Sequence, residues 1–529
     1  MAVPLSLLFG LCFAVTIICA LLGFSRSVFR QRSHDQGLHR NFDRLLCLYL
    51  AAYVPAVLAS EYLVKLELEA IFKSYTSVTT INASILLWMS YASSAVVGTV
   101  ISSYADRYGR CRFVLVFCIF NLLASILLHF DHFGALLIAR IASGIAMSIL
   151  FSCFEGWLVS ECKTRAMHLS EILHILAFGQ FSCGVFAFVG GAVDQVVTVD
   201  PYFELGKGVV EPLMWGGPLL SVDASIVVTM FVVVFVRCTW PENFGRLGDE
   251  RDHWGHHTSL NAGAAVLGES FADWKRSKCT STLFDGMQTM AKSRTMLKLA
   301  TISSCSEGAF YIFFFSWSKY INAMAPQIQI DLMFAIIVLC FMIGSSICPL
   351  LTWPTMAGHG TIKLQLHFVL LTAAASLLPC VFTHNLPFVD LFGFMVFSLC
   401  AGIYVPVLSV YKCSLVPDVA RVSIYNLMRV PFFAIVTCVL MLELSERSIM
   451  LLCAMMEIVS AGAFLAMESQ DKQDRPRETG WAPATLDERN PLPEEHVGLL
   501  DGAQGLLGSV GEEGLEDIPS WVDNEPQEF

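Results

Sequence analysis

The sequence predicts an all-α polytopic membrane protein, because of its composition and its apolar segments. Hydrophobic residues make up 55% of the chain and charged residues only 15%, whereas soluble domains carry about 25% charged residues. The mean hydropathy is +0.62. Thirteen apolar runs of about 20 residues follow one another, and each is long enough to cross the ~30 Å hydrocarbon core of a bilayer as a helix. A soluble globular class is therefore excluded.

Polar loops set the limits of the thirteen apolar runs. The runs cover residues 3–24, 45–66, 82–104, 113–130, 133–159, 172–193, 213–236, 298–320, 331–353, 363–382, 386–411, 422–442 and 448–467. The first run is followed by Arg26, Arg30 and Arg32 and has no basic residue before it, whereas a signal peptide carries its positive charges first. We expect residues 1–44 to form an extra N-terminal transmembrane helix and a basic loop, with a processed signal peptide as the alternative.

The remaining twelve runs predict two bundles of six helices. Residues 45–236 hold the first bundle and residues 298–467 the second, and the linker 237–297 includes a stretch that predicts a short helix on the membrane surface. Basic residues concentrate in alternate loops and in the linker, which places both ends of the twelve-helix set in the cytoplasm.

The acidity of the chain belongs to its C-terminal tail. From Glu468 onward there are 16 acidic and 4 basic residues, which accounts for the whole net charge of −12. Residues 468–529 are rich in Pro, Gly and acids, and this composition predicts a disordered cytoplasmic tail. Glu495, Leu499 and Leu500 match an acidic dileucine signal for a sorting adaptor, with chance as the alternative. We expect the plasma membrane as the location, with an endosomal or vacuolar membrane as the alternative.

An ionisable side chain inside a predicted span costs about 2.5–3.5 kcal/mol on insertion scales and marks a candidate site, and we single out Arg429, Glu307 and Arg140. Arg429 and Glu307 each lie about eight or nine residues into their runs, near the midplane at 1.5 Å per residue. Arg140 precedes a stretch of small residues in the run 133–159. Each arginine predicts either contact with an anion or a structural ion pair. Glu307 predicts either a proton carrier or the partner of an arginine.

A charged turn between two runs predicts an inner gate. Asp106, Arg107 and Arg110 occupy this turn, and Glu155 lies towards the cytoplasmic end of the run 133–159. We expect Glu155 to meet the arginines of the turn in a salt-bridge latch that opens and closes.

A second charged pair predicts an outer gate. Glu61 and Lys65 lie four residues apart towards the outer end of the run 45–66, where they share one helical face. This pair indicates either a gate or a structural ion pair. Lys412, at the edge of the run 386–411, is expected to be an ordinary basic residue at the cytoplasmic surface.

The chain lacks the sequence patterns of an enzyme. It has no nucleophile–base constellation, P-loop or Rossmann glycine pattern, and no basic stripe for nucleic acid. Its 18 cysteines show no metal-ligand spacing and mostly fall in apolar runs, where cysteine behaves as a small hydrophobe. We expect no enzymatic activity, cofactor, bound metal or nucleic-acid partner, and a lipid bilayer as the surroundings.

Several stretches resemble a known family of transporters. Asp106-Arg107-Tyr108-Gly109-Arg110 resembles the loop between the second and third helices of the major facilitator superfamily. More narrowly, the chain resembles the eukaryotic molybdate-anion transporters of that superfamily, in the stretches 150–157, 401–406 and 426–431. Cys111 and Ser102 depart from the superfamily pattern.

This resemblance implies a major facilitator fold with two six-helix bundles plus the extra N-terminal helix. It also implies high-affinity uptake of the molybdate oxyanion by alternating access. Because arginine matches the geometry of an oxyanion, we expect Arg429 and Arg140, with Asn426, to bind the substrate, and Glu307 to carry a coupled proton. Two alternatives stay open. One is a carrier of sulfate, an organic anion or a sugar, and the other is a membrane receptor or scaffold that does not transport.

Overall fold

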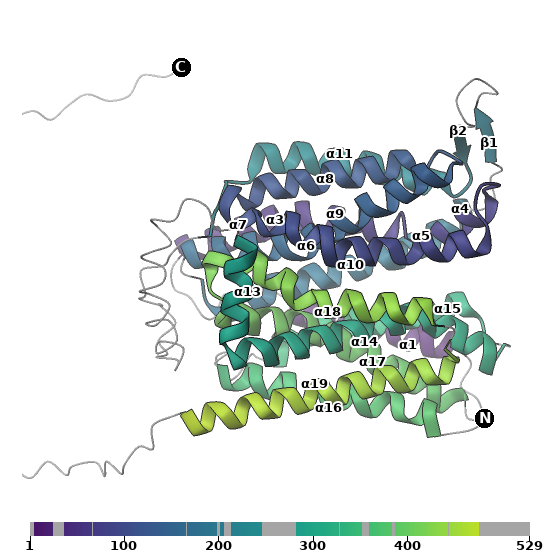
Figure 1. Ribbon diagram of the computed structural model, residues 1–529. Helices are drawn as coiled ribbons and strands as arrows, with labels where there is room; N and C mark the ends of the chain where they lie inside the picture. The colour runs from purple at the N-terminus through teal and green to yellow at the C-terminus, as the bar shows by residue number, and fades with distance from the viewer. Residues whose placement is uncertain are drawn as a thin grey trace, which may run out of the picture. The chain divides into compact units, whose positions relative to one another are not determined.

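The computed structural model of the protein is helical almost throughout (Figure 1). It describes residues 5–24, 36–65, 67–165, 167–197, 202–205, 213–245, 282–326, 328–351, 359–382, 387–442 and 444–474. These residues all lie in one unit, Met1–Arg475. The remainder of the linker and tail, with Glu495, Leu499 and Leu500, lies outside the described residues.

The expected membrane segments of the first half are helices. We use "first half" for α3 to α11 and "second half" for α13 to α19. The first half consists of α3 (Gln36–Val57) with the π-helical turn η1 (Leu58–Tyr62), α4 (Leu68–Ser74), α5 (Thr80–Ser93) with the π-helical turn η2 (Ser94–Gly98), α6 (Thr99–Ser103), α7 (Ala105–Tyr108), α8 (Arg110–Leu127), α9 (Phe133–Thr164), α10 (Leu169–Val197) and α11 (Leu219–Thr239).

The expected segments of the second half are helices as well. They are α13 (Thr282–Lys292), α14 (Arg294–Met324), α15 (Ile330–Leu351), α16 (His359–Phe382), α17 (Pro387–Leu415), the short 3-10 helix η3 (Asp418–Ala420), α18 (Arg421–Met441) and α19 (Glu446–Asp474). Among the described residues, 12 helices are long and apolar enough to span a membrane. The 31-residue helix α14 falls outside that set, because three buried serines and Glu307 occupy its middle.

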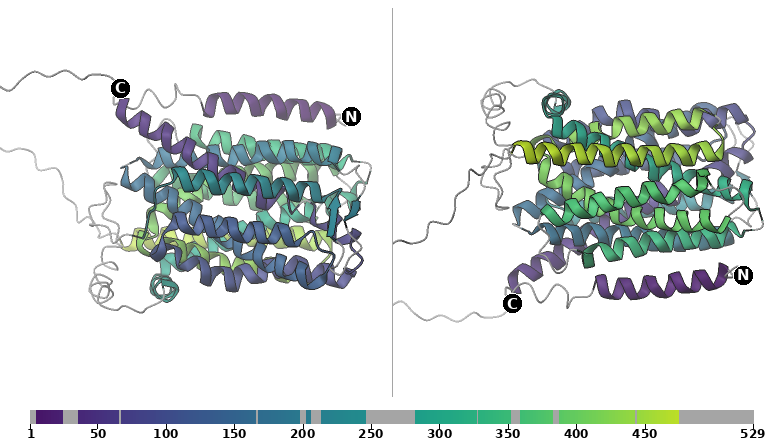
Figure 2. Two further views of the ribbon diagram at one scale, coloured as in Figure 1. Left: turned by 90° about the horizontal axis from the view of Figure 1, so that it is seen from above. Right: turned by 90° about the horizontal axis from the view of Figure 1, so that it is seen from below.

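The two halves lie side by side with their long helices running in one general direction (Figures 1 and 2). The inner end of the bundle carries the short helices α7 and α13, and the outer end carries a β-hairpin. The inner end is the one that the basic loops assign to the cytoplasm. Contacts of α18 with α5, α6 and α9, and of α10 with α15 and α17, form the seam between the halves.

The hairpin at the outer end corrects one predicted boundary. The apolar run 213–236 begins as strand β2 (Leu213–Gly216), which pairs antiparallel with β1 (Tyr202–Leu205), and not as helix. The positive φ angles of Gly216 and Gly217, 89° and 53°, break the chain direction before α11 begins at Leu219. Glycine adopts such angles at little steric cost.

The N-terminal helix α1 (Leu5–Gly23) lies along the outside of the bundle (Figure 2). It packs mainly against α15 of the second half, where a Cβ on Gly23 would lie only 2.2 Å from the Ser346 carbonyl oxygen. It also contacts α10 of the first half, where the Phe9 and Phe188 rings stack with centroids 6.4 Å apart. An apolar crevice of about 270 Å³ lies between these three helices. The extra helix thus touches both halves.

Helix α13 confirms the short helix expected in the linker, and it also packs against α18 and α6. A Cβ on Gly286 would lie 3.1 Å from the Ser423 side chain. Figure 1 shows α13 standing across the inner end of the long helices. The helix therefore contacts the inner ends of both halves.

Candidate functional site

Four charged side chains from four helices meet inside the bundle, and we call them the central charge cluster. Arg429 Nε on α18 donates to Glu307 Oε2 on α14 at 2.8 Å. Glu307 Oε1 lies 3.6 Å from Lys412 Nζ on α17, and Lys412 Nζ lies 3.8 Å from Glu155 Oε2 on α9. Because α9 belongs to the first half and the other helices to the second, the cluster crosses the seam.

Neighbouring groups fix the orientation of the central charge cluster. Ser303, one turn before Glu307, donates through Oγ to Glu307 Oε1 at 2.6 Å. Arg429 Nη1 donates to the Phe151 carbonyl oxygen at 3.0 Å, and its guanidinium lies 4.6 Å from the centroid of the Phe151 ring. A cation over an aromatic face is attracted by the ring quadrupole. The guanidinium is therefore held between a carboxylate of the second half and a backbone carbonyl of the first.

The central charge cluster carries two positive and two negative charges and is formally neutral. The side chains of Arg429, Glu307 and Glu155 are 13%, 15% and 12% exposed, and that of Lys412 is 5% exposed. Both ionic contacts of Lys412 are longer than a hydrogen bond, and Glu155 Oε1 is buried without a hydrogen-bond partner among the described residues. The two cations therefore lie between two carboxylates, and the contacts of Lys412 are the longer ones.

Arg140 lies away from the central charge cluster. On α9 it precedes Phe151, which Arg429 contacts, by eleven residues, or about 16 Å of helix. Arg140 is 2% exposed and donates to the Leu86 carbonyl oxygen at 3.1 Å and to Ser90 Oγ at 2.7 Å, both on α5. It thereby ties α9 to α5, the bonding expected of a structural arginine. The two arginines do not converge on one position in this conformation.

Asn426 is fully buried one turn from Arg429, towards the inner end of α18. Its Oδ1 accepts from Ser148 Oγ on α9 at 2.8 Å, and its Nδ2 donates to the Val422 carbonyl oxygen at 3.0 Å. The amide is therefore engaged in a contact across the seam, next to the cluster, with its oxygen and nitrogen both in use.

The predicted pair of Glu61 and Lys65 forms, with Lys65 Nζ 2.5 Å from Glu61 Oε2. Lys65 also donates to the Tyr311 hydroxyl at 2.9 Å, and that hydroxyl lies 2.9 Å from the Tyr91 hydroxyl. Tyr311 is one turn beyond Glu307 on α14. Lys65 and Tyr91 belong to the first half and Tyr311 to the second, so these four residues, which we call the outer clasp, cross the seam.

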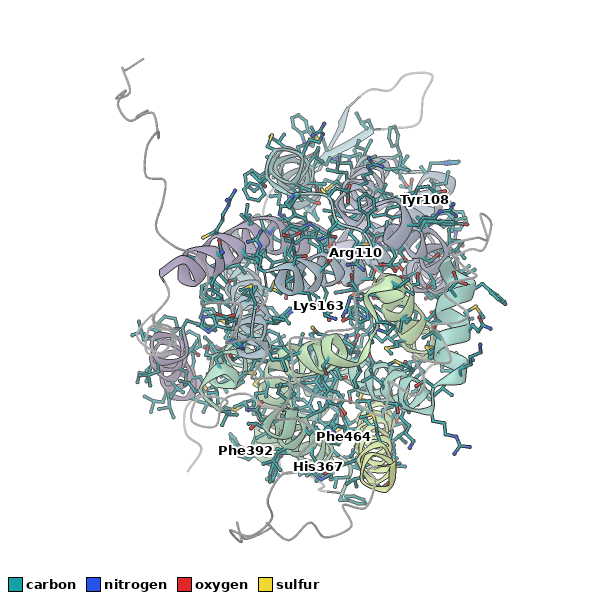
Figure 3. The ribbon with its side chains drawn as sticks, turned by 90° about the vertical axis from the view of Figure 1, so that its left-hand side faces the viewer. Tyr108, Arg110, Lys163, His367, Phe392 and Phe464 are labelled. Atoms are coloured by element: carbon teal, nitrogen blue, oxygen red, sulfur yellow. The ribbon has the colours of Figure 1, made fainter. Side chains whose placement is uncertain are left out.

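A second polar connection, which we call the inner clasp, crosses the seam at the inner end. Asp106 Oδ1 accepts from Arg110 Nη2 at 2.8 Å, and Asp106 Oδ2 accepts from the Ser423 backbone N–H at 3.1 Å. Ser423 lies in the first turn of α18, where free N–H groups favour an anion. Arg110 Nη1 lies 3.1 Å from Asp418 Oδ1, which also pairs with Arg421 at 3.1 Å. Figure 3 shows Arg110 near the middle of the bundle, seen along it from the inner end.

The predicted latch between Glu155 and the arginines of the turn is wrong in its partners. Glu155 instead faces Lys412, because the rotation of α9 turns it into the seam, and Asp418 takes the place expected for it beside Arg110. Arg107 is exposed and lies over the Tyr108 ring, 5.5 Å from its centroid. The ring that Arg107 contacts thus belongs to the first half.

Gly109 explains how the inner turn reverses. Its φ is +112°, and a Cβ there would lie 2.4 Å from the carboxyl carbon of Glu242. Glu242 accepts the backbone N–H groups of Cys111 at 2.8 Å and Arg112 at 3.2 Å, in the first turn of α8. A carboxylate at a helix N-terminus satisfies otherwise unpaired donors. Only glycine combines this backbone angle with the close approach of Glu242.

Four residues that the structure places in polar contacts inside the bundle are not assigned to a site by the sequence analysis. Lys412 was assigned to the membrane surface, yet it is 4% exposed inside the seam. Tyr311, Asp418 and Glu457, which lies in the middle of α19, are not singled out by the sequence analysis. The rule that marks charges inside spans would have found Glu457. No sequence signal separates Lys412 from a surface lysine.

Comparisons with known proteins agree with the fold and with the resemblance in sequence. The family model described as sugar transporters with 12 transmembrane segments matches residues 7–264. The molybdate-anion transporter of Xenopus tropicalis is 23% identical over 388 residues, covering 72% of this chain and 75% of that protein. The molybdate-anion transporter of Danio rerio is 24% identical over 433 residues, covering 80% and 83%.

Solved structures share the architecture at low sequence identity. The proton:xylose symporter XylE matches with a TM-score of 0.54 and 13% identity, over 85% of this chain and 94% of its own. The major facilitator superfamily transporter FucP in its outward conformation matches with a TM-score of 0.55 and 14% identity, over 80% and 98%. The fold is a major facilitator fold, and the chain is a multi-pass membrane transporter. In sequence the chain is similar to the molybdate-anion transporters of Xenopus tropicalis and Danio rerio and, over residues 7–264, to the family model of sugar transporters.

Proposed function

We propose that this transporter takes up molybdate across a membrane by alternating access, with proton coupling, and that the oxyanion binds at the central charge cluster. The observation that carries the proposal is the position of Arg429. Its side chain is 13% exposed, and its guanidinium lies on the seam, where one carboxylate holds it at 2.8 Å. The names of the relatives support an oxyanion as the substrate.

The geometry of Arg429 suits exchange of an internal carboxylate for a tetrahedral oxyanion. A guanidinium presents several N–H donors in a planar fork that matches carboxylates and oxyanions alike. An incoming anion that replaces Glu307 at Nε keeps the cation paired while it frees the carboxylate. Lys412, within 4 Å of both Glu307 and Glu155, supplies the second positive charge. Asn426 and Arg140 are candidate contacts for the anion in other conformations of the cycle.

The charges of the cluster favour co-transport of protons. The cluster is neutral when empty, so a dianion adds two negative charges in a setting of low dielectric. Import against an inside-negative potential costs about 2.3 kcal/mol per charge per 100 mV, or about 4.6 kcal/mol for a dianion. The carboxylate that leaves Arg429 becomes a natural proton acceptor, because it loses its closest cation. Glu307 is therefore the proposed residue for proton coupling.

The two clasps supply the gates of the proposed cycle. The outer clasp joins Lys65 to Tyr311, and the inner clasp joins Arg110 to Asp418. Both join the first half to the second, on opposite sides of the central charge cluster along the membrane normal. Opening one clasp while the other holds would expose the cluster to one side at a time. Asp106, Arg107, Glu155 and Glu61 stay proposed gating residues with the partners described above.

The plasma membrane is the proposed location, with an endosomal or vacuolar membrane as the alternative, and a sorting adaptor at Glu495, Leu499 and Leu500 is the proposed tail partner.

Uptake of labelled molybdate by purified protein in lipid vesicles tests the proposed function. Wild-type protein should accumulate molybdate, and faster with an inward proton gradient. Arg429→Ala should abolish uptake, and Arg429→Lys, which keeps the charge but not the fork, should retain only a small fraction. Arg237→Ala, which removes an exposed arginine at the inner end of α11, is the matched control and should transport normally.

Competition with unlabelled sulfate, an organic anion and xylose identifies the cargo. Molybdate should compete best. Stronger competition by another solute would replace molybdate as the substrate, and wild-type uptake by Arg429→Ala would remove the binding site from the central charge cluster. Deleting residues 476–529 should leave uptake intact, whereas a receptor or scaffold would lose its partners with the tail.

A further inference from the structure

Glu457 is a buried acid that the proposed transport site does not use. It lies in the middle of α19 and is 0% exposed. Its Oε2 accepts a hydrogen bond from Ser306 Oγ on α14 at 2.8 Å. Its Oε1 is buried and has no hydrogen-bond partner among the described residues. The carboxyl group therefore has one donor in a position closed to lipid and to water.

The groups around Glu457 offer it no positive charge. The titratable side chains that face it are the thiols of Cys305 on α14, Cys400 on α17 and Cys453 on α19, and the phenol of Tyr404 on α17. On α16, the other helix packed against α19, the His367 ring lies against Phe464, two turns away from Glu457. In the described part of the chain, the side-chain partner of Glu457 is Ser306, and no lysine, arginine or histidine acts on its carboxyl group.

An ionised carboxylate does not suit these surroundings. Burying an unpaired carboxylate costs several kcal/mol, so such a group takes up a proton instead. A neutral acid fits the observed contacts, because one oxygen accepts from Ser306 and the other carries the proton. An ionisable residue inside a span that has no oppositely charged partner is a functional candidate.

Glu457 is linked to the central charge cluster through α14. Its donor, Ser306, is the residue next to Glu307 in the sequence. The two side chains point from α14 in different directions, Ser306 to α19 and Glu307 to α17 and α18. A movement of α14 that frees Glu307 from Arg429 therefore also shifts the single hydrogen-bond donor of Glu457.

We propose that Glu457 is a second proton-binding site of the transport cycle, occupied in this conformation, and that it carries one of two protons taken up with each oxyanion. This inference rests on the proposed function. One proton on Glu307 offsets only half the charge of a dianion, and a proton on Glu457 offsets the other half. The proton binds the carboxylate from one aqueous side in one conformation and leaves to the other side when α14 moves.

The number of coupled protons tests this inference. Protein in vesicles is given a fixed pH difference at zero membrane potential, and the accumulation ratio of labelled molybdate is measured. Each pH unit multiplies this ratio by about 100 with two coupled protons and by about 10 with one, since one pH unit per proton is a factor of ten. Wild-type protein should show the larger factor and Glu457→Gln the smaller. Glu69→Gln, an exposed acid outside the spans, is the matched control and should keep the larger factor.

Infrared spectroscopy reads the proton on Glu457 without any transport. The difference spectrum of wild-type minus Glu457→Gln protein should contain the carbonyl stretch of a protonated carboxylic acid near neutral pH. Ser306→Ala removes the single donor but keeps the acid. It should keep the band and the larger factor. Glu457→Ala, which also removes the acid, provides the second variant if Glu457→Gln fails to fold, and it should lack the band and show the smaller factor.

The outcomes separate this inference from the proposed function. A Glu457→Gln protein with the wild-type factor overturns the coupling role, even if the band is present, because the acid is then only structural. Absence of the band overturns proton binding. Wild-type protein that shows no molybdate uptake overturns the proposed function and the coupling role with it, while the band still decides whether Glu457 holds a proton.

Discussion

Replacing Arg429 and Glu307 with glutamine, singly and together, should give stability losses that do not add. Removing one partner of a buried ion pair costs about 3–5 kcal/mol. The free energy of unfolding should here fall by about 2–3 kcal/mol in each single variant, because the charged residue that is not replaced keeps another partner. Glu307 keeps Lys412 at 3.6 Å, and Arg429 keeps the Phe151 carbonyl oxygen at 3.0 Å. In the double variant two neutral amides face each other, so its loss should also be about 2–3 kcal/mol. The coupling energy is then about 2 kcal/mol.

Thermal or denaturant unfolding of the four purified proteins measures this coupling. The matched control is the cycle of Glu69→Gln and Lys73→Gln, an ion pair with the same 2.8 Å separation but with side chains 71% and 74% exposed. Its coupling should stay below about 0.5 kcal/mol, as for other exposed pairs. Additive losses at Arg429 and Glu307 would contradict the ion pair described here, and with it the displacement of Glu307 by an oxyanion.

Three further outcomes are expected. In an unfolding assay, Gly109→Ala should lower the free energy of unfolding by about 2 kcal/mol or more, because of the +112° φ of this residue and the nearby Glu242 carboxylate. Gly190→Ala is the control and should not be destabilising, because the space around its Cβ is open. Tyr311→Phe removes a hydroxyl bonded across the outer clasp; spin labels on the two halves should then show a larger outward-open population, and an unchanged distance distribution would contradict the clasp. Burial opposes ionisation of Asp131, but hydrogen bonds from two neighbouring residues outweigh it and hold its pKa below the ordinary 3.8. The stability that it adds over Asp131→Asn should be complete above pH 3.8 and disappear as the pH falls through the lowered pKa, which melting curves across pH can measure.

The membrane segments were predictable because the signal for each is local. A run of about 20 apolar residues has one outcome in a bilayer, and all thirteen runs contain a long helix. The start of the run 213–236 was misplaced because strand β2 is as apolar as a span, and its partner strand lies upstream across a loop. The pairing of β1 with β2 depends on the connection between the two strands, and the hydrophobic composition of the run does not reveal it.

The partners of the charged side chains were much less predictable. Glu61 and Lys65 were paired from sequence because four-residue spacing on a helix is enough. Glu155 was assigned to the wrong cation, because its neighbours are set by the rotation of α9 about its axis. Arg429 and Glu307 are 122 residues apart, and only the packing of α14 on α18 brings them together. The same holds for Lys412, because the sequence gives its position along the chain but not the helices that its side chain faces.

The position of α1 has a consequence for how the two halves can move. Its tight packing at Gly23 fixes it to α15, whereas its contacts with α10 are mainly between aromatic rings, which slide past one another more easily than backbone pressed on backbone. If the two halves rock against each other, α1 would therefore move with the second half and slide over the surface of α10. Helix α1 shields the line where α10 meets α15 from the acyl chains, so a hydrophilic cargo would pass between the ends of the bundle without meeting lipid on this side.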